Sequence, residues 1–121
     1  MSEYSSIKEF LEGRDELNKT LISGGDRILK RVLSVDSSAY DSGALDEGMK
    51  ELLGLTASLV LRCDDCIAWH VHRCMETGVT REQFTEALGI GAVVGGTITI
   101  PHIRRAMALW GPEDLEDSGE N

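Results

Sequence analysis

Two cysteines and a histidine in the segment Cys63-Asp64-Asp65-Cys66-Ile67-Ala68-Trp69-His70 have the types and spacing of a thiol redox site. The thiols are three residues apart, and His70 follows Cys66 by four residues. At the start of a helix, unpaired backbone N–H groups and the helix dipole favour thiolate over thiol. A dithiol in this position can cycle to a disulfide, and an imidazole one turn further along can exchange a proton with Cys66.

The helical spacing also sorts the other candidate groups around this site. On a helix, Cys66, His70 and Cys74 share one face, but Cys74 is about 12 Å from Cys66, too far for a disulfide. We therefore interpret Cys74 as a small core residue. Cys63 is nearer the helix end and is expected to be the more exposed thiol, whereas His70 favours Cys66 as the activated one. The order of attack stays open.

Glu51 is a candidate for the third member of a proton relay. It precedes Cys63 by 12 residues, which is about 18 Å along a continuous helix. If the chain instead reverses near Arg62, two antiparallel helices bring Glu51 within about one turn of the level of His70. A carboxylate there can hold the imidazole tautomer and stabilise its protonated form.

Hydrophobic periodicity predicts an all-α fold in a single domain. Apolar residues repeat at helical spacing, and Thr80 with Gln83 forms a capping-box pattern. A loop is expected over 36–43, where Ser, Asp and Gly are frequent. The predicted helices cover residues 6–21, 26–33 (with Ile28, Leu29, Val32 and Leu33 inward), 45–62, 63–76, 80–95 and 97–110.

Composition and charge limit the classes of partner. The chain of 121 residues has 12 Lys and Arg against 21 Asp and Glu, so nucleic acid and anionic membranes are disfavoured. Residues 112–121 form an acidic segment that is expected to be a disordered tail. The N-terminus lacks the pattern of a signal peptide, which predicts a cytoplasmic protein. Two largely apolar helices in so small a chain predict a homo-oligomer.

Two other interpretations of the thiols stay open. Cys63, Cys66 and His70 could bind Zn²⁺ with Cys74 or His72 as a fourth ligand, although the second ligand pair of common closed sites is missing. The cysteines could also be buried structural residues. His72 and His102 are interpreted as surface or interface residues. The redox dithiol is the preferred hypothesis, and it needs neither a metal nor a cofactor.

The pattern Glu51, Cys63-x-x-Cys66 and His70, followed by the turn 78–83 and a Gly-rich apolar helix, resembles the alkylhydroperoxidase D branch of the carboxymuconolactone decarboxylase family. The resemblance implies an all-helical bundle over residues 45–111, and the helices predicted in residues 1–44 precede it in the same domain. It also implies assembly as a trimer or hexamer.

The same resemblance implies a function. The dithiol would reduce hydroperoxides or disulfides with electrons from a dithiol or lipoyl-type donor, and Glu51 and His70 would form the proton relay. One residue departs from the pattern, because Asp65 stands where the peroxidases carry a histidine. Two adjacent carboxylates oppose thiolate formation, so disulfide exchange is an equally open reaction. Non-redox chemistry of the decarboxylase kind is a further alternative.

Overall fold

The computed structural model describes residues 4–111, which form α-helices and one short 3₁₀ helix, η1. The elements are α1 (Ile7–Gly24), α2 (Arg27–Ala39), α3 (Glu47–Leu61), α4 (Asp64–Glu76), α5 (Arg81–Gly95), η1 (Thr97–Thr99) and α6 (Ile100–Trp110). The all-α prediction is confirmed. The acidic segment 112–121 lies outside the described residues, and the division of the chain at residue 44 stays a prediction.

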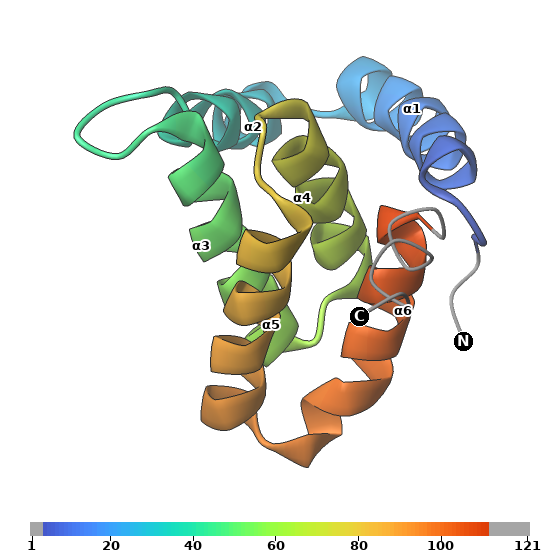
Figure 1. The fold of residues 1–121 in the computed structure, drawn as a ribbon. Helices are drawn as coiled ribbons and strands as arrows, with labels where there is room; N and C mark the ends of the chain where they lie inside the picture. Colours follow the sequence, from blue (N-terminus) through green and yellow to red (C-terminus); the bar gives the residue numbers. More distant parts are fainter. Residues whose placement is uncertain (1–3, 112–121) are drawn as a thin grey trace.

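Helices α3 to α6 pack side by side around one apolar core (Figure 1). The core is aliphatic with two aromatic rings, Phe84 of α5 and Trp110 of α6, which stack with their centroids 4.6 Å apart. Local signals fix the helix ends. Gly78 has a positive φ of 83° after α4, and the capping box of Thr80 and Gln83 opens α5 as expected.

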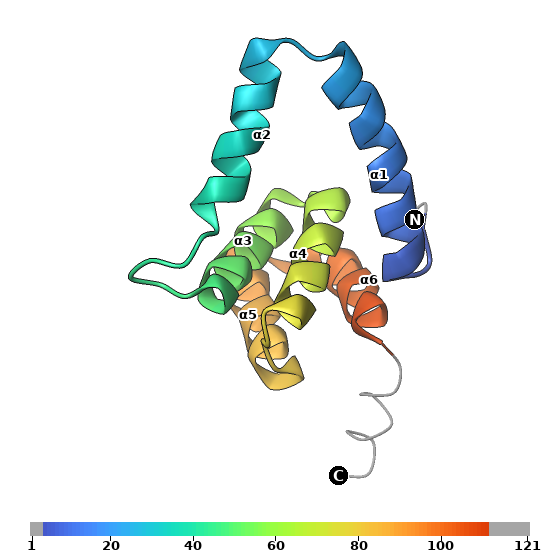
Figure 2. The same ribbon diagram turned by 90° about the horizontal axis from the view of Figure 1, so that it is seen from above.

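Helices α1 and α2 extend away from this four-helix unit and meet at the turn after Gly24 (Figure 2). The prediction for α2 was wrong in two respects. The helix continues to Ala39 through the expected loop, and it buries no residue. Ile28, Leu29 and Val32 are exposed rather than inward, because α3 to α6 already fill the core of a single chain.

Over residues 4–111, none of the helices combines the length and the apolar content that crossing a bilayer requires.

Candidate active site

The chain reverses between α3 and α4, and this reversal assembles the site (Figure 1). Arg62 ends α3 in the left-handed conformation, with φ 59° and ψ 41°, and its N–H bonds to the carbonyl of Leu59. A non-glycine residue rarely adopts this conformation. The expected antiparallel pair is therefore present, and Glu51 lies opposite His70.

Glu51 and His70 form a buried pair at the centre of the site. His70 Nδ1 lies 2.8 Å from Glu51 Oε1, and the Glu51 side chain is only 1% exposed. The second carboxylate oxygen lies 3.4 Å from Nε of Arg73, one turn further along α4. Arg73 also pairs with Glu76, and this hydrogen bond is the largest of the effects that raise the pKa of its guanidinium. The buried carboxylate thus has a fixed cation on one side and an imidazole on the other.

Tyr40 completes the surroundings of the imidazole, and no motif in the sequence indicates this contact. Its hydroxyl lies 3.4 Å from His70 Nε2, and the two rings are 5.3 Å apart. Burial and the nearby carboxylates raise the pKa of Tyr40, so its hydroxyl stays protonated near neutral pH. Both side chains pack over Gly54 of α3, where a Cβ atom would lie 2.6 Å from His70 Cε1 and 2.7 Å from the Tyr40 hydroxyl. Gly54 provides the space that this contact needs.

The two cysteines lie at the N-terminus of α4, as the spacing predicts. Cys63 is the N-cap residue, its sulfur accepts a hydrogen bond from the Cys66 N–H, and the two sulfurs form a disulfide across a Cα–Cα distance of 5.3 Å. The expectation that Cys63 is the more exposed of the pair was wrong. Cys66 is exposed and Cys63 is half-buried, because the N-cap side chain folds back over the first turn.

A charged cluster holds the first residue of α4. Asp64 Oδ1 lies 2.7 Å from His102 Nδ1, and Asp64 Oδ2 accepts a hydrogen bond of 2.9 Å from Arg105 Nη2. Burial alone would raise the pKa of Asp64, but the hydrogen bonds from His102 and Arg105 outweigh it and lower this pKa. The sequence predicts that His102 is a surface or interface residue, and in the structure it contacts Asp64 at the start of α4.

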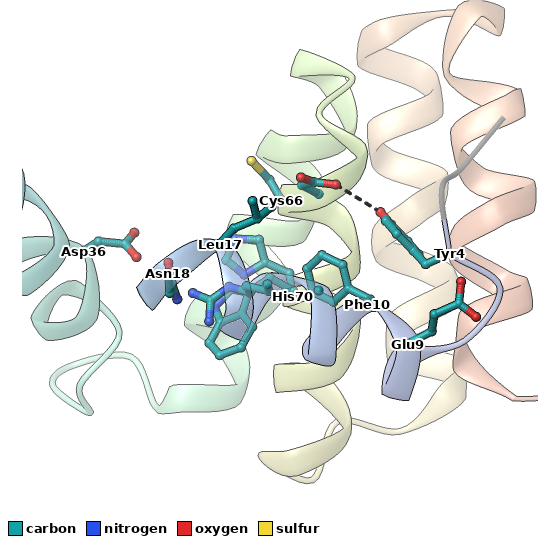
Figure 3. Close-up of a pocket in the computed structure, with 12 residues that line it drawn as sticks. Tyr4, Glu9, Phe10, Leu17, Asn18, Asp36, Cys66 and His70 are labelled. Carbon is teal, nitrogen blue, oxygen red and sulfur yellow. Dashed lines mark hydrogen bonds between the residues drawn. The ribbon is translucent and has the colours of Figure 1, made fainter. Parts of the chain in front are cut away.

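A cleft of about 570 Å³ opens in front of Cys66 and His70. Figure 3 shows residues of α1, among them Phe10, facing α4 across it. Trp69 forms part of the wall, and the guanidinium of Arg14 stacks 3.7 Å from the centre of its ring. Cys66 and His70 therefore share one cleft with an aromatic wall, and the cleft is large enough for a small molecule.

Cys74 is fully buried in the core, as expected. Burial, with a smaller contribution from Glu51, raises the pKa of its thiol to about 12. Within residues 4–111, no three side chains of His, Cys, Asp or Glu are grouped in a way that could hold a metal ion.

Comparison with known proteins places this geometry in a family. The sequence profile of the carboxymuconolactone decarboxylase family matches residues 26–109, which include the cysteine pair, His70 and Glu51. The chain belongs to the carboxymuconolactone decarboxylase family. One member, TM1620 from Thermotoga maritima, has a sequence 48% identical to this chain. Its crystal structure superposes with a TM-score of 0.84, and the match covers 94% of this chain and 98% of TM1620.

A second structure of TM1620 has a TM-score of 0.81 and 49% identity, covering 93% of this chain and 96% of its own. It is described as a carboxymuconolactone decarboxylase family protein for which involvement in an antioxidative response has been suggested. A family protein of Legionella pneumophila shares the fold at 23% identity, with a TM-score of 0.75 and coverage of 86% of this chain and 93% of its own.

Two sequence relatives match parts of this chain. An uncharacterised protein of Cupriavidus necator is 31% identical over 76 residues, which are 63% of this chain and 67% of the relative. Alkyl hydroperoxide reductase AhpD of Mycolicibacterium paratuberculosis is 41% identical over 46 residues, 38% of this chain and 26% of its own length. The likeness to AhpD is therefore high over a short segment.

Proposed function

We propose that this family member is a thiol–disulfide oxidoreductase in which the Cys63/Cys66 dithiol reduces disulfides or hydroperoxides. The observation that carries the proposal is the shared cleft. Cys66 is exposed in it, and His70 lines the same cleft while its other face is bound to buried Glu51. A nucleophile, a base and a residue that orients the base form the usual arrangement for activating a thiol.

The reaction with a peroxide begins at the exposed thiol. The Cys66 thiolate attacks one peroxide oxygen, the O–O bond breaks, and the departing alkoxide takes a proton to become an alcohol. Cys63 then attacks the sulfur of the resulting sulfenic acid, and water leaves as the disulfide forms. An external dithiol, such as a lipoyl-type donor, reduces this disulfide by exchange and is itself oxidised.

A disulfide substrate follows the same order. The Cys66 thiolate attacks one substrate sulfur and releases a thiol, and Cys63 resolves the mixed disulfide and releases the second thiol. In either reaction His70, held by Glu51, takes the proton from the thiol and returns it to the leaving group. The catalytic roles of Cys63, Cys66, His70 and Glu51 are all part of this proposal.

The test is a side-by-side assay with a hydroperoxide and with a protein disulfide, using dihydrolipoamide as the donor. Cys66→Ser and Cys63→Ser should abolish turnover, while Cys74→Ser serves as the matched control because that thiol is buried and un-ionised. Donor-dependent reduction of either substrate that survives in a variant lacking both Cys63 and Cys66 would refute the proposal.

The protein is further proposed to act as a homo-oligomer, for which the resemblance implies a trimer or hexamer. The apolar face of α2 supports this, since Val32 and Val35 are exposed on a helix that stands away from the core (Figure 2). Val93 and Val94 at the end of α5 are also exposed. A second copy of the chain would cover surface of this kind.

A further inference from the structure

The two cations on Asp64 come from a single helix far away in the sequence. His102 and Arg105 are three residues apart, so they lie on the same side of α6 and reach the start of α4 together. Each binds a different oxygen of the carboxylate, at 2.7 and 2.9 Å. Tyr4 adds a hydrogen bond of 3.0 Å to the backbone carbonyl of Asp64. The side chain and the backbone of this residue are thus both held.

The position of Asp64 makes its charge important for the dithiol. It lies between Cys63 and Cys66 in the sequence and in the first turn of the helix that both thiols begin. An uncompensated carboxylate in the same helical turn disfavours a thiolate by like-charge repulsion. An arginine side chain carries a fixed positive charge, whereas a histidine carries one only when its ring is protonated. Arg105 is therefore the permanent countercharge.

We propose that Arg105 is a positioning residue for the redox dithiol, which keeps the reacting thiol ionised by pairing with Asp64 and cancelling the repulsion that this carboxylate would exert. The inference rests on the proposed function, because that function requires a thiolate at the start of α4. Arg105 acts through Asp64 and contacts no substrate. His102 supports the same carboxylate through its other oxygen.

Other ionisable groups line the cleft that contains Cys66 or lie beside the start of α4, and they also influence the thiols. They are Tyr4 before α1, Glu9 and Arg14 of α1, Asp36 of α2, Arg62 after α3, Asp65 and His70 of α4, and His102 of α6. None of them is altered in the test below.

The test measures the rate of alkylation of the reduced protein by iodoacetamide as a function of pH, which reports the thiolate without any turnover. In Arg105→Met, the pH midpoint of alkylation should rise, and alkylation at pH 7 should slow by roughly three- to tenfold. This effect is at the low end for a neighbouring charge, because the cluster is partly exposed. Asp64→Asn should shift the midpoint in the opposite direction, since it leaves Arg105 uncompensated. In the double variant, the midpoint should return close to that of the wild type.

Arg104→Met is the matched control, because it removes the same charge from an exposed neighbouring position of α6. An equal shift in Arg104→Met and Arg105→Met would overturn the inference, as would a double variant that keeps the full shift of Arg105→Met. If Arg105→Met does not fold, Asp64→Asn alone decides, and an unchanged or raised midpoint refutes the inference. Absence of turnover in the wild type would refute the proposed function but leave these midpoints interpretable.

Discussion

Gly54 offers a sharp test of whether the buried pair is a working part of the site. An alanine Cβ at this position would lie 2.6 Å from His70 Cε1 and 2.8 Å from Nε2, whereas ordinary contact begins at 3.4 Å. The imidazole would therefore have to move by about 0.8 Å. Its Nδ1 is held by the buried carboxylate of Glu51 at 2.8 Å, so we expect the movement to disturb that bond.

The two consequences of Gly54→Ala act on different measurements. Alanine favours the helix by about 1 kcal/mol over glycine, while overpacking typically costs about 1–3 kcal/mol, so the net loss of stability should stay below about 2 kcal/mol. A displacement near 1 Å in a catalytic group can cost about 100-fold in rate, so turnover should fall by roughly ten- to 100-fold. The thermal midpoint should change little while activity is largely lost.

The assay compares dihydrolipoamide-dependent turnover with thermal unfolding followed by circular dichroism. Gly89→Ala of α5 is the control, because a Cβ there meets nothing within 4 Å. That variant should be slightly more stable and fully active. Wild-type turnover in Gly54→Ala would refute the argument, because it would mean that the position of His70 does not matter for the reaction.

Three further expectations concern other parts of the molecule. Glu51→Gln keeps the volume of the side chain but cannot stabilise a protonated His70, so turnover should fall by roughly tenfold or more in the same assay while the protein remains folded. Because burial raises the pKa of Cys74 to about 12, this thiol stays protonated at lower pH. Iodoacetamide at pH 8 should therefore modify two thiols in the reduced native protein and three in denaturant. Modification of three thiols in the native protein would contradict the burial of Cys74. Val93→Asp should lower the mass measured by light scattering, because it places a charge in the exposed apolar end of α5. Thr85→Asp, at an exposed position of the same helix, is the control. An unchanged mass in Val93→Asp would show that this end of α5 is not an interface.

The elements that carry the chemistry could be predicted from the sequence because their signals are local. The cysteine spacing, the capping box at Thr80 and the glycine at position 78 each specify a few adjacent residues, and the structure agrees with all of them. The reversal at Arg62 could only be stated as a condition. Its left-handed conformation is carried by a residue type that gives no turn signal.

The error on α2 has a different cause. The periodicity of Ile28, Leu29 and Val32 correctly indicates an amphipathic helix. Ser37 and Ser38 lie in its last turn, where serine is only weak evidence for a loop. An apolar face shows that something must cover it, but not whether the cover belongs to the same chain. In a single copy the core is complete without α2, so its face is exposed.

The charges around the dithiol show most clearly what local reasoning lacks. Read along the sequence, Asp64 and Asp65 are two equivalent carboxylates that oppose a thiolate. In the fold they differ, because α6 brings Arg105 and His102 to Asp64 from about 40 residues away, whereas Asp65 stays exposed with the Tyr4 hydroxyl at 3.5 Å. The repulsion expected of two charges is thereby reduced, and the remaining carboxylate, Asp65, is exposed to water, which weakens its effect. The case against an ionised dithiol in this protein is correspondingly weaker than its sequence indicates.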